Sequence, residues 1–225
     1  MKLINLNYNV FTRGVMFLTS SEIVEKKIVS KGVKQIVGVD LTVEKVFRIT
    51  PRIVINFDKT IKCLDTEWCS KNREVVELLE KIIKECPYPI EGLRINLALL
   101  NVNGKEVKIL PKIEEVKPIV VNNVKYFILY AFKEPEYYLL TSSEVKIPLN
   151  VFGIAFRRST FMRSGLIVIN TIFDPFYQGE PVTLIQVPPY TVVILYQGCG
   201  ITQLICAKVE KIEKGYSGTY QGEKY

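Results

Sequence analysis

Residues 158–179 read RSTFMRSGLIVINTIFDPFYQG, and this stretch is the most informative of the chain. It opens with basic and hydroxyl side chains, continues through apolar residues and closes on Asp-Pro-x-Tyr-x-Gly. Short β-prone segments surround it, separated by glycine, proline and polar turns, at residues 137–140, 144–147, 153–156, 166–169, 181–187, 192–196 and 201–209. Strands of this length and spacing are typical of a jelly roll or barrel. We therefore expect a mainly β chain.

Residues 58–135 differ from this β-rich part, and we expect them to form an α+β insertion in one domain that spans residues 1–225. Apolar residues recur at helical spacing between residues 72 and 85. Asn103-Gly104 is typical of a hairpin turn, and Asn122-Asn123 marks a second hairpin. The insertion shows no catalytic pattern in its sequence.

The two ends of the chain carry weaker signals. Residues 1–17 have the pattern of strands and turns, and a short helix is expected to begin at Ser20, a candidate N-cap. Residues 215–225 are rich in glycine, tyrosine and glutamine. This composition suits either a frayed terminus or a flexible lid that orders over a ligand.

The chain has 225 residues, with 30 lysines and arginines against 23 acidic residues, a formal net charge of +7, and no histidine. The lack of histidine excludes Ser-His-Asp and Cys-His catalysis and histidine-containing zinc sites. The positive excess suits an anionic partner such as a nucleotide, or it is a solvated basic surface. The basic residues are scattered, so we expect no sequence-specific nucleic-acid binding.

The five cysteines never form a CxxC pattern and are expected to be mostly buried thiols of a cytoplasmic protein. Cys63 could nevertheless form a disulfide with Cys69 or with Cys86, since thermophile cytosols tolerate such bonds. The abundance of lysine, glutamate, isoleucine and valine hints at a thermophile. No apolar run reaches the length of a membrane span, so no membrane partner is expected.

Residues 158–179 begin with four residues whose side chains donate hydrogen bonds, namely Arg158, Ser159, Thr160 and Arg163. Guanidinium groups match phosphate with two parallel hydrogen bonds, and the N–H groups of a tight turn can add to such a site. The cluster therefore indicates a phosphate-binding site. The alternative is a surface turn that carries two arginines by chance.

Three further side chains could carry chemistry. Asp174 is either a turn-forming residue or a catalytic base beside an apolar pocket. Tyr177 either stacks on a sugar or base or belongs to the core. Gln203 is a lone amide among apolar neighbours, which either binds phosphate oxygens or satisfies the backbone.

The order of these segments resembles that of a known family. A Gly-x-Asp-Leu segment at residues 38–41 comes first, followed by Ile147-Pro148, the basic cluster and the Asp-Pro-x-Tyr-x-Gly turn. A Gly-x-x-Ile-x-Gln-Leu segment follows at residues 198–204, and Tyr-Ser-Gly-x-Tyr-Gln-Gly-Glu at residues 216–223. This succession resembles the dUTPase and dCTP deaminase superfamily, most closely its archaeal dUTPase branch. The resemblance covers residues 15–50 and 136–225.

The resemblance implies a distorted jelly-roll-like β-barrel of the trimeric dUTPase (β-clip) type, with three active sites shared between subunits. It implies hydrolysis of dUTP to dUMP and pyrophosphate, with Mg²⁺ bound through the triphosphate. This chemistry needs charge neutralisation and an in-line water, and it needs no histidine.

Carried over position by position, the resemblance gives each candidate residue a role. Asp174 would orient and deprotonate the attacking water, Tyr177 would pack against the deoxyribose, and the backbone of residues 174–179 would read uracil. The other residues would hold the phosphates (Arg158, Ser159, Thr160, Gln203), match an arginine that the deaminases also use (Arg163) or close over the nucleotide (Tyr220, Gln221). Asp40, in the first motif, would be structural or lie near the metal.

Two rival functions remain on this resemblance, of which the first is a dCTP deaminase or a bifunctional dCTP deaminase and dUTPase. The deaminases carry a catalytic glutamate five residues after the hairpin glycine, where this chain has Leu184, so we expect no deamination of dCTP. A catalytically impaired nucleotide-binding or interaction protein is the other rival. It is favoured by the insertion, by residues 187–189, which read Val-Pro-Pro where the family often has asparagine, and by Phe176, which could crowd the uracil pocket.

Overall fold

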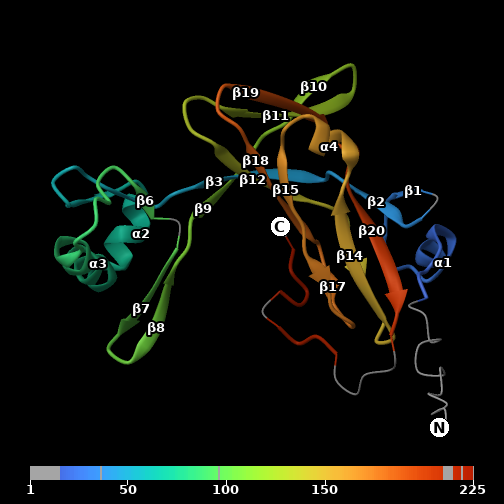
Figure 1. Cartoon of the computed structure of the whole chain (residues 1–225), viewed down its shortest axis with the longest axis horizontal. Helices are drawn as coiled ribbons and strands as arrows, with labels where there is room; N and C mark the ends of the chain where they lie inside the picture. The colour runs from blue at the N-terminus through green and yellow to red at the C-terminus, as the bar shows by residue number, and fades with distance from the viewer. Residues whose placement is uncertain (1–15, 36, 96, 210–214, 219, 225) are drawn as a thin grey trace, which may run out of the picture. The chain divides into compact units, whose positions relative to one another are not determined.

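The computed structural model describes residues 16–35, 37–95, 97–209, 215–218 and 220–224. By its internal contacts the chain forms two compact units, one of Met1–Val46 with Val116–Tyr225 and one of Phe47–Glu115. Strands far outnumber helices among the described residues, so the prediction of a mainly β chain is confirmed (Figure 1). No helix in these ranges is long and apolar enough to cross a membrane. Apart from Met16 and Phe17, the pattern expected for residues 1–17 lies outside the described residues.

The first unit is a distorted jelly-roll-like β fold. One sheet has the strand order β1-β2-β20-β14-β16, a second contains β15-β18-β12 and the start of β3, a third is β10-β11-β19, and β13 pairs with β17. The elements are α1 (Ser20–Glu25), β1 (Val33–Lys34), β2 (Val39–Thr42), β3 (Lys45–Thr50), β10 (Ile119–Val121), β11 (Val124–Ala131), β12 (Glu136–Thr141), β13 (Val145–Lys146), β14 (Val151–Arg157), α4 (Ser159–Arg163), β15 (Ile167–Ile169), β16 (Ile172–Phe173), β17 (Gln178–Gly179), β18 (Val182–Val187), β19 (Thr191–Tyr196) and β20 (Gly200–Lys208). All seven strand segments expected after residue 136 are present.

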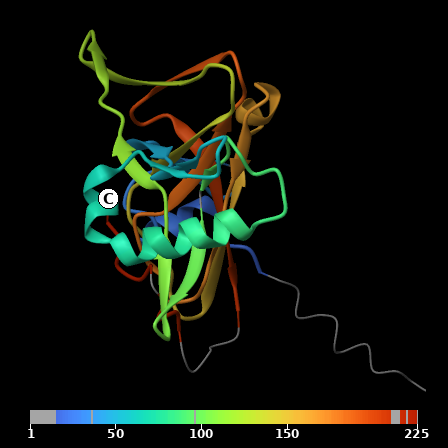
Figure 2. The ribbon, with the colours of Figure 1, turned by 90° about the vertical axis from the view of Figure 1, so that its left-hand side faces the viewer.

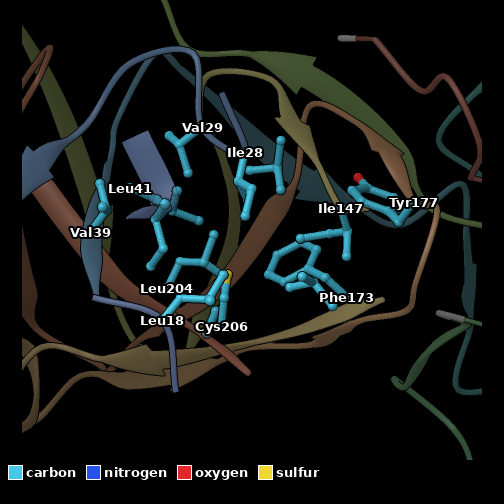
Figure 3. Packing of buried hydrophobic residues seen from close by; sticks show 14 residues of the cluster. Leu18, Ile28, Val29, Val39, Leu41, Ile147, Phe173, Tyr177, Leu204 and Cys206 are labelled. Carbon is cyan, nitrogen blue, oxygen red and sulfur yellow. The ribbon is translucent and has the colours of Figure 1, made fainter. Parts of the chain in front are cut away.

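Strand β14 is the centre of the sheet that positions the candidate site. It pairs with β20 along its whole length and with β16 near its start. A Cβ on Gly153 would lie 2.9 Å from Cδ1 of Leu204 and 3.3 Å from Cβ of Phe173, so only glycine lets both neighbours pack this closely. Phe173 and Leu204 consequently belong to the same buried apolar cluster, which Figure 3 shows from close by. The next residue, Asp174, is exposed.

The helix α1 begins at Ser20, as expected, but its N-cap is one residue earlier than the sequence suggested. Thr19, not Ser20, is the N-cap, because its hydroxyl accepts a hydrogen bond from the N–H of Glu22 at 3.2 Å. The carboxylate of Glu22 in turn accepts from the N–H of Thr19 at 2.8 Å, which completes a capping box. The sequence carries this signal, because a glutamate lies three residues after Thr19 and an isoleucine three residues after Ser20, and the prediction of Ser20 overlooked it.

The second unit is of α+β character, as expected for the insertion. Its helix α3 places Val75, Leu79 and Ile83 against Leu100 and Ile109 of a two-stranded sheet, across which it lies in Figure 2. The helix and the Asn103-Gly104 hairpin are both confirmed, the latter with φ angles of 51° and 80°. The elements are β4 (Ile53–Ile55), β5 (Ile61–Cys63), α2 (Thr66–Lys71), α3 (Arg73–Glu85), β6 (Arg94–Ile95), β7 (Ala98–Val102), β8 (Lys105–Ile109) and β9 (Lys112–Glu115).

The bounds of this unit differ from residues 58–135. It begins at Phe47, inside β3, and ends at Glu115, where β9 pairs back with β3. The second predicted hairpin, at Asn122-Asn123, joins β10 to β11 in the first unit. The reason is burial, because the alternating pattern of β11 places Phe127 and Leu129 in the core of the first unit.

A disulfide joins Cys63 at the end of β5 to Cys69 in α2, and Cys86 is a free thiol. We expect the Cys63→Ser/Cys69→Ser variant to lose about 2 kcal/mol of unfolding free energy, because the bond closes a short loop in the unfolded chain. Urea unfolding of the variant and of the oxidised wild type measures the difference. Cys86→Ser is the matched control, and an equal loss there would contradict this stabilising role.

Candidate active site

The first part of the site surrounds Arg158, which follows β14 and forms the N-cap position of α4. Its Nε lies 3.4 Å from Oδ2 of Asp40 in β2, and its Nη1 donates a 3.4 Å hydrogen bond to the carbonyl of Gly200. The same Oδ2 of Asp40 accepts a 2.7 Å hydrogen bond from Nε2 of Gln35. We call Gln35, Asp40, Arg158 and Gly200 together the cationic cluster.

Asp40 is the buried anchor of the cationic cluster, with only 2% of its surface exposed. Burial raises the pKa of its carboxyl, whereas Arg158 and the Gln35 hydrogen bond act in the opposite direction. A Cβ on residue 200 would lie 2.7 Å from Nη1 of Arg158 and 3.1 Å from Oδ2 of Asp40, so glycine lets both side chains keep these positions. Asp40 therefore positions the arginine, while 39% of the Arg158 side chain stays open to solvent.

The other predicted phosphate ligands lie around this cluster to different degrees. Arg158 and Thr160 line one cavity of about 270 Å³, together with Gly200. Ser159 and Arg163 are exposed on α4 but do not line that cavity. Gln203 is the cross-strand partner of Asp40, and its amide donates a hydrogen bond to the carbonyl of Val37.

The second part of the site is the turn that carries Asp174. The N–H of Tyr177 donates to the carbonyl of Asp174 at 3.1 Å. The N–H of Phe176 donates to the carbonyl of Ile147 at 2.9 Å, and the N–H of Ile147 donates to the carbonyl of Tyr177 at 2.8 Å. Phe176 has a φ of 72°, a left-handed conformation that is unusual for a bulky residue. The turn is thus held in one shape by hydrogen bonds from outside it.

Tyr177 is buried and packs against Phe173 and Tyr216, with ring centroids 5.4 and 5.9 Å apart. Burial, followed by the nearby Glu223, raises the pKa of its hydroxyl far above the ordinary value, so the phenol stays protonated. A Cβ on Gly179 would lie 2.9 Å from this hydroxyl, which explains the glycine of the motif.

Asp174 and Tyr177 line a cavity of about 410 Å³ together with Tyr216, Tyr220 and Glu223 from the C-terminal segment. Phe176 does not line this cavity, so its ring does not crowd it. Sequence reasoning missed Glu223, whose carboxyl pKa is raised by burial. Its one signal is its place at the end of the quoted C-terminal motif. Gln35 was also missed, and nothing in its sequence neighbourhood marks it.

The two parts lie at opposite ends of β14, as Figure 1 shows for α4 and β17. Phe173 is opposite Gly153 in the β14–β16 pair. Arg158 lies five residues further along one direction and Asp174 one residue further along the other, a separation of about 20 Å at roughly 3.3 Å per residue. The residues that line the two cavities do not overlap.

The described residues contain no group of three cysteine or carboxylate side chains that could hold a metal ion. Asp40, the candidate near the metal, is already bonded to Gln35 and Arg158. A Mg²⁺ ion at this site would therefore need most of its ligands from phosphate oxygens and water, which is the coordination it prefers in nucleotide sites.

Comparison with known proteins gives a consistent set of relatives. Residues 102–209 match the family model described as dCTP deaminase-like. The dUTP nucleotidohydrolase of Methanocaldococcus jannaschii is 31% identical over 86 residues, which are 38% of this chain and 54% of that protein. A probable dUTP nucleotidohydrolase of Sulfolobus islandicus rod-shaped virus 1 is 34% identical over 125 residues, 54% of this chain and 77% of that protein.

The relatives also include dCTP deaminases. The dCTP deaminase of Sulfurisphaera tokodaii is 29% identical over 163 residues, 68% of this chain and 87% of that protein. Several other relatives are matched over only about half to two thirds of their length. A solved dCTP deaminase from Agrobacterium tumefaciens has a TM-score of 0.47 at 10% identity, covering 87% of this chain and 49% of that one.

We expect Arg158→Ala to lower the free energy of unfolding by about 1 to 3 kcal/mol, because Asp40 would keep its buried charge without a cation. The loss should be larger at pH 7 than at pH 4. Burial raises the pKa of Asp40, so at low pH the carboxyl is neutral in the folded protein and needs no cation. As the pH rises through that pKa the carboxyl becomes charged, and the contribution of the neutral carboxyl to folding stability is lost.

Chemical denaturation at both pH values measures this loss. Arg163→Ala, on the exposed side of the same helix, is the control and should change stability by less than about 0.5 kcal/mol. Equal losses for the two arginines, or a loss that does not depend on pH, would contradict the role given to Asp40.

Proposed function

Because the chain belongs to the dUTPase and dCTP deaminase superfamily, we propose that it is a dUTP diphosphatase, which hydrolyses dUTP to dUMP and pyrophosphate. One observation carries this choice. Asp174 is an exposed carboxylate at a cavity that also holds the ring of Tyr177, while Leu184, at the position of the deaminase glutamate, is an apolar residue within β18. A carboxylate that activates water is retained, and the deaminase side chain is not.

In this proposal each part of the chain has one task. Asp174 accepts the proton of the attacking water, and the protonated, buried Tyr177 offers its ring to the deoxyribose. Arg158 neutralises phosphate charge, and the hydroxyls of Ser159 and Thr160 donate hydrogen bonds to the phosphates. Preorganised groups of this kind stabilise the transition state most where its charge develops. Mg²⁺, bound through the triphosphate, adds charge neutralisation. The 20 Å gap means that no single copy can do both tasks on one phosphate.

We therefore also propose that the enzyme is a homotrimer whose copies complete each other's sites. A large apolar surface of the β10-β11-β19 sheet supports this. The register pairs Tyr126 with Tyr196, Ile128 with Ile194 and Tyr130 with Val192, all on the face opposite the buried Phe127, Leu129 and Leu195. Val192 and Ile194 are each 63% exposed. Monomers rarely expose apolar patches of this kind, which mark interfaces.

The position of this surface favours a second copy as its occupant. Ile194 and Tyr196 also line the cavity of Arg158, so whatever covers the sheet comes next to the cationic cluster. That cluster lacks the water-activating carboxylate, and a second copy would supply one. The impaired-enzyme rival loses one of its three supports in part, because Phe176 does not line the Asp174 cavity.

Pyrophosphate release from dUTP, dCTP and dTTP with Mg²⁺ tests the reaction. We expect activity on dUTP and a fall of about 10²- to 10⁴-fold in Asp174→Asn, since that is the usual contribution of a general base. Glu180→Gln, which changes the nearest acidic neighbour in sequence, should keep most of the activity. A folded wild-type protein that is inactive on all three nucleotides would refute the proposal, and ammonia release from dCTP would favour the deaminase.

Mixing variants tests the shared site. Arg158→Ala and Asp174→Asn should each be inactive alone. After joint unfolding and refolding of equal amounts, about a quarter of the sites would combine an intact arginine with an intact aspartate if the two come from different copies of a symmetric trimer. We expect activity to recover to that level.

The control mixture combines Arg158→Ala with the double variant Arg158→Ala/Asp174→Asn, in which no site can be complete. It should stay inactive. Failure of the first mixture to recover, with trimers present by light scattering, would show that the two residues do not act together across copies.

A further inference from the structure

The C-terminal segment is bonded to the Asp174 turn of its own chain. Backbone hydrogen bonds run from the N–H of Tyr216 to the carbonyl of Pro175 at 2.8 Å and from the N–H of Gly222 to the carbonyl of Gln178 at 2.7 Å. A third runs from the N–H of Glu180 to the carbonyl of Glu223 at 2.9 Å. The segment therefore adds to the turn in the manner of an extra strand.

Gln221 makes two further bonds through its side chain. Its Oε1 accepts a 3.2 Å hydrogen bond from the N–H of Gln178, and its Nε2 donates a 3.0 Å hydrogen bond to the carbonyl of Phe176. The turn thus offers one backbone donor and one backbone acceptor side by side. A carboxamide, which carries an acceptor oxygen and a donor nitrogen on the same carbon, satisfies both.

A uracil ring carries the same pair of groups. Its carbonyl oxygen and its ring N–H sit on one carbon, in the same plane and on the same side, as in a primary amide. The Gln221 carboxamide and the edge of a uracil are therefore chemically interchangeable toward the Phe176 carbonyl and the Gln178 N–H. Both cannot occupy these two groups at once.

Packing holds the segment where this bond pair forms. Tyr216 is partly buried against the apolar cluster that contains Tyr177. A Cβ on Gly215 would lie 2.3 Å from Cβ of Phe176, so only glycine allows the backbone to pass this close to the ring. Phe176, the residue that Gly215 approaches, is also the one with the left-handed φ of 72°. The side chain of Gln221 is itself exposed, so a ligand can displace it without disturbing the core.

We propose that Gln221 is an internal competitor for the base-binding edge of the turn, and that a uracil nucleotide must displace its carboxamide from Phe176 and Gln178 in order to bind. This inference rests on the proposed function, because it takes uracil as the ligand. It differs from the role that the resemblance implies for Gln221, which is to close over a nucleotide already bound. The two roles make opposite predictions for the removal of the carboxamide.

Calorimetric titration with dUMP separates them, using the full chain, Gln221→Ala and the control Lys224→Ala, an exposed position on the same segment. We expect Gln221→Ala to bind dUMP about three- to tenfold more tightly than the wild type, which corresponds to a segment that covers the edge roughly 70 to 90% of the time. Lys224→Ala should bind like the wild type. Amide hydrogen exchange at Gln178, without ligand, should be faster in Gln221→Ala alone.

Equal or weaker dUMP binding by Gln221→Ala would overturn the inference while leaving the proposed function intact, and weaker binding would establish the closing role instead. Unchanged exchange at Gln178 would likewise overturn it, because the carboxamide would not be covering that N–H. If none of the three proteins binds dUMP, the proposed function fails, and the inference fails with it.

Discussion

The antiparallel pairing of β14 with β20 and β16 is the constraint on which the rest of the candidate site depends. It fixes the register of Gly153 opposite Phe173 and thereby sends Arg158 and Asp174 in opposite directions. The distance between them follows from strand geometry, about 20 Å, and no side-chain rotamer can close it. Every functional consequence of the fold starts from this separation.

At each end of β14, a single chain supplies only some of the groups that the proposed reaction requires. At one end, Arg158 is held by buried Asp40, and the described residues that line its cavity include no carboxylate that could activate water. At the other end, Asp174 lines a preformed cavity. Gln221 of the same chain bonds to the backbone of the same turn, at Phe176 and Gln178. On the two proposals above, a single copy is a resting form. Assembly would bring a second copy's carboxylate to Arg158, and a bound nucleotide would displace Gln221 from the turn.

Local chemistry made much of this predictable from the sequence. The Asn-Gly hairpin, the amphipathic helix α3 and the strands after residue 136 depend on near neighbours and were found. The choice of Asp174 and Arg158 as site residues came from the order of the motifs and stays a prediction. The bounds of the second unit and the attachment of Gln221 to the turn depend on contacts between distant segments, which no periodicity or motif encodes. The disulfide partner of Cys63 and the bond from Gln35 to Asp40 lie close in sequence, but they depend on how the short connections between them fold.

A crystal structure of the chain with α,β-imido-dUTP and Mg²⁺ would test the central claim most directly, through the distances from one bound nucleotide to the nearest Asp174 and Arg158. We predict that these two residues come from different copies, while the pair within each copy remains about 20 Å apart. A nucleotide contacted by Asp174 and Arg158 of one and the same chain would contradict the account.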